Sequence, residues 1–194
     1  MNNERFYFGP LVLQYNVDNT LIEELKNRGN KSDVYYNKNL AGFINEEKSY
    51  NKNDIEWFSN AFLKYLSDYA NQLHKYGHFP KQTSKLKLTS LWINYMKAGE
   101  FNPIHSHDGD LSFVIYLDVP SILEEKSTEY ITSASKPGSI DFFYCESQHF
   151  CVTNYNYFPK TGDMIIFPAT LKHMVNPFYL NVERVSVSGN ISFI

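Results

Sequence analysis

The sequence predicts a mostly β fold preceded by helices, an α+β arrangement whose β part is a sandwich or barrel. Hydrophobic residues make up 43% of the 194 residues and aromatic residues 16%, which is enough to bury a core and excludes a disordered chain. The spacing of apolar residues is helical before residue 80 and changes to strict alternation after residue 86. Short strand-like segments with turn signals then follow one another closely, a pattern typical of sandwiches and barrels.

We expect one domain over residues 1–194, in which residues 1–85 supply a strand and helical support and residues 86–194 form the β core. The formal net charge of −3 gives no strong nucleic-acid signal. The two cysteines, Cys145 and Cys151, do not make a disulfide framework, so we expect a reducing, cytoplasmic location. Neither a signal peptide nor a membrane segment is visible, and no membrane partner is expected.

The first helix is expected from about Asn19 to Arg28. Thr20 and Glu23 have the spacing of a capping box, and Gly29 is expected to end the helix.

A second, longer helix is expected to begin at Asn53, with Glu56 completing the N-cap signature, and to end at Gly77. Its apolar residues recur at steps of three and four, which indicates a side that faces the core: Ile55, Phe58, Phe62, Tyr65, Leu66, Tyr69 and Leu73.

The β core is predicted from alternating, β-branched and aromatic segments. The expected strands are Leu86–Tyr95, Leu111–Val119, Ser139–Tyr144, Gln148–Thr153, Met164–Phe167, Arg184–Ser188 and Ile191–Phe193, with an edge strand within Phe6–Val17.

Two histidines one residue apart are candidate metal ligands. In an extended chain, His105 and His107 point to the same face, so both side chains can bind one ion. His173 follows a predicted buried strand, and a barrel can bring it to the same place. Imidazole suits Fe, Zn, Cu or Ni. The alternative is that these are loop residues on a polar rim; the remaining histidines, His74, His78 and His149, are expected to be structural.

Arg184 and Ser186 are candidate ligands for a carboxylate. They face the same side of a predicted strand, where a two-pronged guanidinium and a hydroxyl form a clamp for a carboxylate group. Arg184 is the only arginine after residue 28, which argues against a filler role. The alternative is a surface arginine on an edge strand.

The order and spacing of these residues resemble the Fe(II)- and 2-oxoglutarate-dependent oxygenases over roughly Leu88 to Ile194. The chain looks most similar to the small, functionally uncharacterised oxygenases of bacteria and their phages, and residues 40–42 share that likeness. The motifs that carry the resemblance are Trp92–Asn94, Asn102–Pro103, His105–His107, Leu111–Tyr116, Gly162–Pro168, His173 and Arg184–Ser186.

The resemblance implies a double-stranded β-helix core, also called a jelly-roll or cupin-like core. It implies a dioxygenase that uses Fe(II), 2-oxoglutarate as cosubstrate and O₂ to hydroxylate an unknown substrate, either a small molecule or a protein side chain. A phage-encoded member would act inside the host cell.

The resemblance also implies roles for single residues. His105 matches the first iron ligand and His173 the distal one. Arg184 matches the residue that pairs with the far carboxylate of 2-oxoglutarate, and Ser186 its helper hydroxyl. Asn94 and Tyr116 match further cosubstrate contacts.

One position departs from the family pattern, in which an acid stands two residues after the first histidine. Here that position is His107, so the iron is expected to have three histidine ligands. Alternatively, Asp108 or Asp110 supplies the carboxylate. In a third interpretation the motif begins at His107, Gly109 takes the acid position, and a coordination place stays free for halide.

Two other function classes fit the same residues. A cupin-type dioxygenase with three histidines would work without 2-oxoglutarate, and Arg184 would then bind a carboxylate of the substrate. A jelly-roll binding domain or virion-associated domain would carry the β pattern without catalysis.

Overall fold

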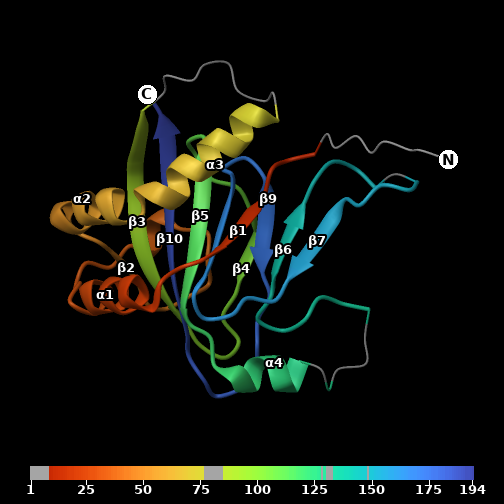
Figure 1. Cartoon of the computed structure of the whole chain (residues 1–194). Coiled ribbons are helices and arrows are strands. Elements are labelled where there is room, and N and C mark those ends of the chain that lie inside the picture. The colour runs from red at the N-terminus through yellow and green to blue at the C-terminus, as the bar shows by residue number, and fades with distance from the viewer. Residues whose placement is uncertain (1–8, 77–84, 128, 130–132, 148) are drawn as a thin grey trace.

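The computed structural model describes residues 9–76, 85–127, 129, 133–147 and 149–194, and contains two antiparallel sheets packed face to face (Figure 1). The larger sheet has the strand order β1-β8-β5-β10-β3-β2 and the smaller the order β4-β9-β6-β7. The strands are β1 (Leu13–Asn16), β2 (Glu47–Ser49), β3 (Leu86–Met96), β4 (Asn102–His105), β5 (Leu111–Asp118), β6 (Ile140–Phe143), β7 (Asn154–Tyr157), β8 (Asp163–Pro168), β9 (Lys172–Val175) and β10 (Arg184–Phe193).

The strands β3 to β10 form the double-stranded β-helix, which confirms the predicted fold class. Four of them, β3, β5, β8 and β10, lie in the larger sheet, and β4, β6, β7 and β9 form the smaller one. Strands β1 and β2 extend the larger sheet at its two edges. The edge strand expected within Phe6–Val17 is therefore confirmed as β1, and its residues 6–8 lie outside the described residues.

Helices cover the outer face of the larger sheet (Figure 1). The side chains of β5 alternate between two cores: Phe113 and Ile115 pack under the helices, while Val114 and Tyr116 lie between the sheets. This double burial explains why β5 reads as a nearly continuous apolar segment. None of the described helices is long and apolar enough to cross a membrane. The helices are α1 (Asn19–Asn30), α2 (Lys52–Ala61), α3 (Leu63–Lys75) and α4 (Ser121–Ser127), with a 3₁₀ turn at Asn37–Asn39.

The prediction that Gly29 ends the first helix was wrong. α1 continues through Gly29 and is capped by Lys31, and its N-cap residue, Asp18, makes no side-chain cap. A β-carbon at Gly29 would lie 2.5 Å from Ile93 Cδ1 and 2.6 Å from the Tyr50 hydroxyl. Glycine is needed at this position because the helix approaches the sheet closely.

The predicted long helix is two helices, and its expected cap at Asn53 was wrong by two residues. Asn51 is the N-cap, and its side-chain oxygen accepts from the Asp54 N–H at 3.0 Å. α2 and α3 are separated at Phe62, whose ring stacks on Phe58 with centroids 4.2 Å apart. Both helices face one core, so the regular spacing of apolar residues continues from α2 into α3. The break between the two helices therefore cannot be recognised from the spacing. The expected end at Gly77, and His78, lie outside the described residues.

The strand predictions need two corrections. Arg184–Ser188 and Ile191–Phe193 belong to one strand, β10, with an irregularity between Asn190 and Ile191. Residues 149–153 form no strand, and residue 148 lies outside the described residues. Phe150 has φ of 59°, which interrupts an extended chain, so the strand is displaced to β7.

Candidate metal and cosubstrate site

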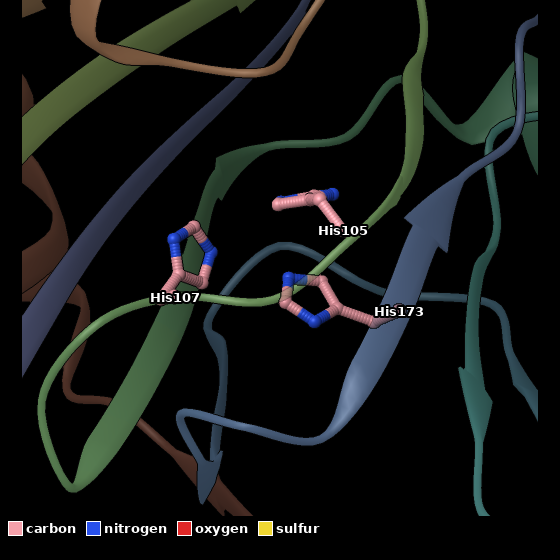
Figure 2. Close-up of side chains that lie close together, drawn as sticks. All are labelled: His105, His107 and His173. Atoms are coloured by element: carbon pink, nitrogen blue, oxygen red, sulfur yellow. The ribbon is translucent and has the colours of Figure 1, made fainter.

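Three histidine rings converge between the two sheets (Figure 2). His105 ends β4, His107 lies in the following loop, and His173 lies in β9. Pairing of β4 with β9 places His105 directly opposite His173. The ring centroids are 4.3 Å apart for His105 and His173, 4.8 Å for His105 and His107, and 5.1 Å for His107 and His173. The structure thus brings together the three residues that the sequence singled out.

Backbone hydrogen bonds orient two of the rings. His105 Nδ1 lies 2.7 Å from the Pro103 carbonyl oxygen, and His173 Nδ1 lies 2.9 Å from the Leu171 carbonyl oxygen. A carbonyl oxygen only accepts hydrogen bonds, so each Nδ1–H donates and each Nε2 keeps its lone pair. This second contact of an imidazole is typical of histidines that bind metals, because it fixes both the tautomer and the ring orientation.

The three imidazoles are uncharged at neutral pH. Burial, together with the charge of neighbouring histidines, lowers the pKa of His107 to about 4 and that of His173 to about 3. Burial also lowers the pKa of His105. Neutral imidazole is the form that binds metal. The ligand atoms lie within 4.8 Å of one another, and this is the one group of its kind among the described residues.

Neither aspartate of the alternative ligand sets joins this cluster. Asp108 and Asp110 are exposed, and the Asp110 carboxylate accepts from the Phe193 N–H at 2.8 Å. Either carboxylate would have to move inward to replace an imidazole. The geometry fits the three-histidine set as it stands.

All seven residues singled out in the sequence line one cleft of about 600 Å³, part of which is open to solvent. The metal candidates lie against the smaller sheet, and the cosubstrate candidates come from the larger one. They are His105, His107, His173, Asn94, Tyr116, Arg184 and Ser186.

A polar row crosses the inner face of the larger sheet. The strand register aligns Glu47 with Asn94, Asn94 with Ser186, and Ser186 with Tyr116. Side chains directly opposite in neighbouring strands point to the same face, and all four residues line the cleft. Sequence reasoning missed Glu47, because β2 is only three residues long and no local pattern marks it.

Arg184 is a buried cation without an anionic partner among the described residues. It is 2% exposed, so the alternative of a surface arginine is excluded. Nη1 donates to the Gly138 carbonyl oxygen at 2.6 Å and Nη2 contacts Met96 Sδ at 2.9 Å, while Nε is buried with no hydrogen bond. No ion pair of the described residues involves Arg184. Burial lowers its pKa, but a guanidinium keeps its charge.

The Tyr116 hydroxyl is a second buried group in this cleft without a hydrogen-bond partner. The guanidinium carbon of Arg184 lies 5.5 Å from the centre of the Tyr116 ring. Burial raises the pKa of Tyr116 to about 12, so the hydroxyl stays protonated and can donate. Leaving buried donors unpaired costs free energy, and a carboxylate bound here would satisfy both donors and the charge. These residues therefore fit an anionic cosubstrate.

Comparison with known families identifies the family of the chain. A family model described as "Putative 2OG-Fe(II) oxygenase", in which 2OG is 2-oxoglutarate, matches residues 90–190, more than half of the chain. The chain belongs to the 2OG-Fe(II) oxygenase family. It is an enzyme of a family that uses Fe(II), 2-oxoglutarate and O₂, and the matched segment contains all seven residues discussed above. This favours 2-oxoglutarate chemistry over the cosubstrate-free dioxygenase and the non-catalytic domain.

Solved structures share the fold of this 2OG-Fe(II) oxygenase at low sequence identity. A viral collagen prolyl hydroxylase from Paramecium Bursaria Chlorella virus-1, in complex with 2OG, is 15% identical, with a TM-score of 0.59 over 93% of this chain and 94% of the hydroxylase. A prolyl hydroxylase from Trichoplax adhaerens, in complex with a hypoxia inducible factor peptide, is 14% identical, with a TM-score of 0.57 over 96% of this chain and 83% of its own.

A 2OG-Fe(II) oxygenase family oxidoreductase from Burkholderia pseudomallei is 19% identical, with a TM-score of 0.42. The match covers 69% of this chain and 57% of the Burkholderia protein. None of the curated protein sequences is similar enough to match this chain.

Proposed function

We propose that this oxygenase binds Fe(II) through His105, His107 and His173 and hydroxylates a substrate that enters the same cleft. Arg184 then binds the far carboxylate of 2-oxoglutarate. The observation that carries this proposal is the buried guanidinium without a counter-ion, in a cleft that also holds three neutral imidazoles.

Each polar residue of the larger sheet contributes a different group to the binding of 2-oxoglutarate. Arg184 supplies the charge and the unpaired Nε–H, and Tyr116 supplies the unpaired hydroxyl. Asn94 and Ser186 belong to the same polar row. Asn94 Nδ2 donates to the Ser186 carbonyl oxygen at 3.3 Å and lies 3.5 Å from Ser186 Oγ and 3.4 Å from Ser188 Oγ. These weak contacts leave the amide and the hydroxyls free to turn toward a ligand.

Bound iron and 2-oxoglutarate supply an O₂-dependent oxidation in which 2-oxoglutarate becomes succinate and CO₂ and a substrate C–H bond is hydroxylated. The residues around the imidazoles orient the ligands and exclude water. Phe167 packs against His173 with ring centroids 4.8 Å apart, and Trp92 packs against His107 with ring centroids 5.8 Å apart.

We also infer that residues 1–194 form one domain in which residues 1–85 support the catalytic core. Helices from the first part share a core with β3, β5 and β10, which supports this division of labour. The cleft accepts a small molecule or a protein side chain as substrate. A cytoplasmic location remains our prediction from the two free, exposed cysteines.

The ligand assignment is tested by the iron content of variants. We expect about one Fe(II) per chain in the wild type and loss of tight binding in His105→Ala and His173→Ala, because each removes one ligand. His74→Ala is the matched control, since His74 is exposed on α3 and should leave the iron content unchanged. Anaerobic equilibration with Fe(II), followed by gel filtration and iron analysis, gives the stoichiometry.

The outcome for the third histidine discriminates between the ligand sets. If His107→Ala weakens iron binding, all three imidazoles ligate the ion. An unchanged affinity would mean that Asp108 or Asp110 completes the site. Full iron content in His105→Ala or His173→Ala would remove that residue from the ligand set.

A further inference from the structure

The cleft contains a second buried charged residue, which the binding of iron and 2-oxoglutarate leaves unused. Glu47 lies on β2, at the edge of the larger sheet, and is 1% exposed. Its side chain lines the same cleft as the three histidines and Arg184. In the polar row it stands beside Asn94, at the end opposite Tyr116.

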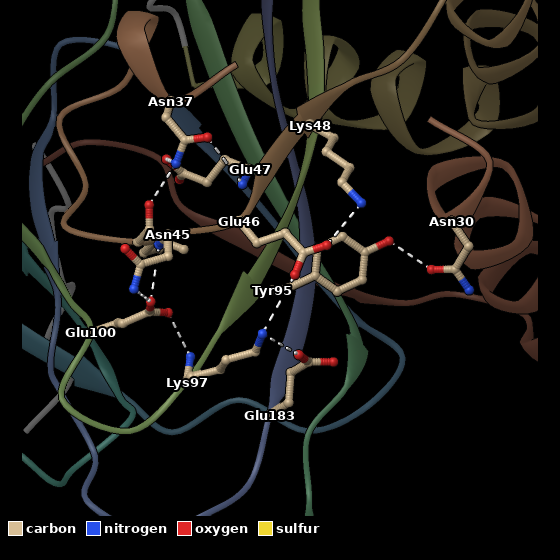
Figure 3. A network of polar contacts seen from close by, with 11 residues as sticks. Asn30, Asn37, Asn45, Glu46, Glu47, Lys48, Tyr95, Lys97, Glu100 and Glu183 are labelled. Carbon is tan, nitrogen blue, oxygen red and sulfur yellow. Dashed lines mark hydrogen bonds and ion pairs between the residues drawn. The ribbon is translucent and has the colours of Figure 1, made fainter. Parts of the chain in front are cut away.

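The Glu47 carboxyl is poorly satisfied by the protein. Its single side-chain hydrogen bond is a long one, in which Asn37 Nδ2 donates to Oε2 at 3.4 Å, and no hydrogen bond of the described residues reaches Oε1 (Figure 3). Gly42 lies near this group, since a β-carbon built there would be 3.4 Å from Oε1, at van der Waals distance. The same β-carbon would overlap Asn102 Oδ1, so Gly42 and Asn102 enclose this end of the cleft.

The neighbouring acid, Glu100, shows what a structural carboxylate looks like in this fold. Glu100 is 6% exposed and accepts three hydrogen bonds, from the Asn45 N–H at 2.9 Å, from Asn45 Nδ2 at 2.6 Å and from the Lys97 N–H at 2.7 Å (Figure 3). Glu47 has no comparable set of donors. A purely structural role therefore explains Glu100 and does not explain Glu47.

In the described part of the chain, no basic side chain forms an ion pair with either of these acids. The Lys97 ammonium group bonds to Glu46 and Glu183 instead (Figure 3). Among the described residues, no ion pair involves Glu47 or Glu100. Burial, and then the charge of Glu100, raise the pKa of Glu47 to about 7, which reports the missing counter-charge. A cation brought into this end of the cleft would find a negative potential and an open carboxylate oxygen.

The cleft is therefore bipolar. Arg184, on β10, marks the end that suits the dianion 2-oxoglutarate, and Glu47, two strands away on β2, marks an end that repels it. We propose that Glu47 is the residue that recognises the substrate, and that the substrate carries a cationic nitrogen group, an ammonium or a guanidinium. This rests on the proposed function, because the oxidised carbon must reach the iron in the same cleft.

The test measures binding of small cations and their neutral isosteres by calorimetry. The probes are n-propylguanidinium against propylurea, and n-butylammonium against butanol, titrated into the Fe(II)–2-oxoglutarate protein under anaerobic conditions and into the metal-free protein. Glu47→Gln removes the charge and keeps the shape. Glu46→Gln is the matched control, since Glu46 is the preceding residue and pairs with Lys48 and Lys97 rather than lining the cleft.

We expect at least one cation to bind the wild type at least about tenfold more tightly than its neutral isostere, the effect of one charged hydrogen bond. This preference should disappear in Glu47→Gln and persist in Glu46→Gln. Equal binding of cation and isostere by the wild type, or an unchanged preference in Glu47→Gln, would overturn the proposal. If the cation preference is present but 2-oxoglutarate does not bind, the proposed function fails and the cation site stands.

Discussion

Burial of the Arg184 guanidinium costs free energy unless an anion compensates its charge. The sequence drew attention to this residue because it is the only arginine after residue 28, and the strand pattern aligned it with Ser186. The sequence did not predict the contacts of the two terminal guanidinium nitrogens: Nη1 donates to the Gly138 carbonyl oxygen, and Nη2 contacts Met96 Sδ. These contacts hold the guanidinium in place and leave the buried Nε–H without a hydrogen bond, and we propose that it donates to 2-oxoglutarate.

Arg184→Lys should weaken 2-oxoglutarate binding by about ten- to a hundredfold, because lysine keeps the charge but loses the planar set of donors, and one charged hydrogen bond accounts for such a factor. Iron binding should be unchanged, since the proposed ligands lie on β4, β9 and the loop after β4. The measurement is the dissociation constant of 2-oxoglutarate in the anaerobic Fe(II) protein. An unchanged constant would show that charge alone suffices.

Glu47 should make the metal-free protein less stable as the pH rises. Its folded-state pKa of about 7 is above the ordinary 4.5, so the folded protein holds the proton more tightly than the unfolded chain. The stabilising effect is complete below pH 4.5 and is lost between pH 4.5 and 7. The free energy of unfolding that Glu47 contributes is thus about 3 kcal/mol higher below pH 4.5 than above pH 7. Urea unfolding of wild type and Glu47→Gln at several pH values should show the variant gaining relative stability across this interval.

The three histidines titrate in both proteins, so their effect cancels in the difference. Glu46→Gln should show no such gain between pH 5.5 and 7, the upper part of this interval, because the hydrogen bond from Lys48 lowers the pKa of Glu46 and keeps it ionised there. A constant difference between wild type and Glu47→Gln over this range would contradict the account of Glu47.

Among the helices and strands, the sequence best predicted those whose buried apolar residues recur at regular spacing. β3, β5 and β8 were located within two residues because apolar side chains fill them. β7 was misplaced because its Asn-Tyr-Asn-Tyr sequence lies at the edge of the smaller sheet, where none of its side chains is fully buried. β4 and β9 are four residues each and were predicted only as the surroundings of His105 and His173.

Gly29→Ala tests the packing of α1 on the sheet. Alanine in a helix interior normally gains about 1 kcal/mol over glycine. Here the new methyl group would lie 2.5 Å from Ile93 Cδ1 and 2.6 Å from the Tyr50 hydroxyl, and overpacking typically costs about 1–3 kcal/mol. We expect overpacking to prevail and the midpoint of urea unfolding to fall.

Asn27→Ala is the control for this variant, because Asn27 is exposed on the same helix. The Asn27→Ala protein should be slightly more stable than the wild type, through helix propensity alone. If Gly29→Ala is also stabilised, the close approach of α1 to Ile93 and Tyr50 does not require glycine.

At the scale of the whole molecule, the fold assembles one cleft from segments that are far apart in the chain. Spacing and family resemblance together were enough to predict that His105, His107 and His173 meet, because the order of strands in a double-stranded β-helix is fixed. They were not enough to predict Glu47, whose position depends on the pairing of β2 with β3. Such long-range register leaves no local mark in the sequence.

The most direct test of the central claim is titration of 2-oxoglutarate into the anaerobic Fe(II) protein, followed by the charge-transfer absorbance that chelation produces. We expect saturable binding by the wild type and much weaker binding by Arg184→Ala, with the iron content of the two proteins equal. Equal affinity in both proteins would remove Arg184 from the cosubstrate site. No absorbance change in the wild type would contradict the account as a whole and favour a three-histidine dioxygenase that works without 2-oxoglutarate.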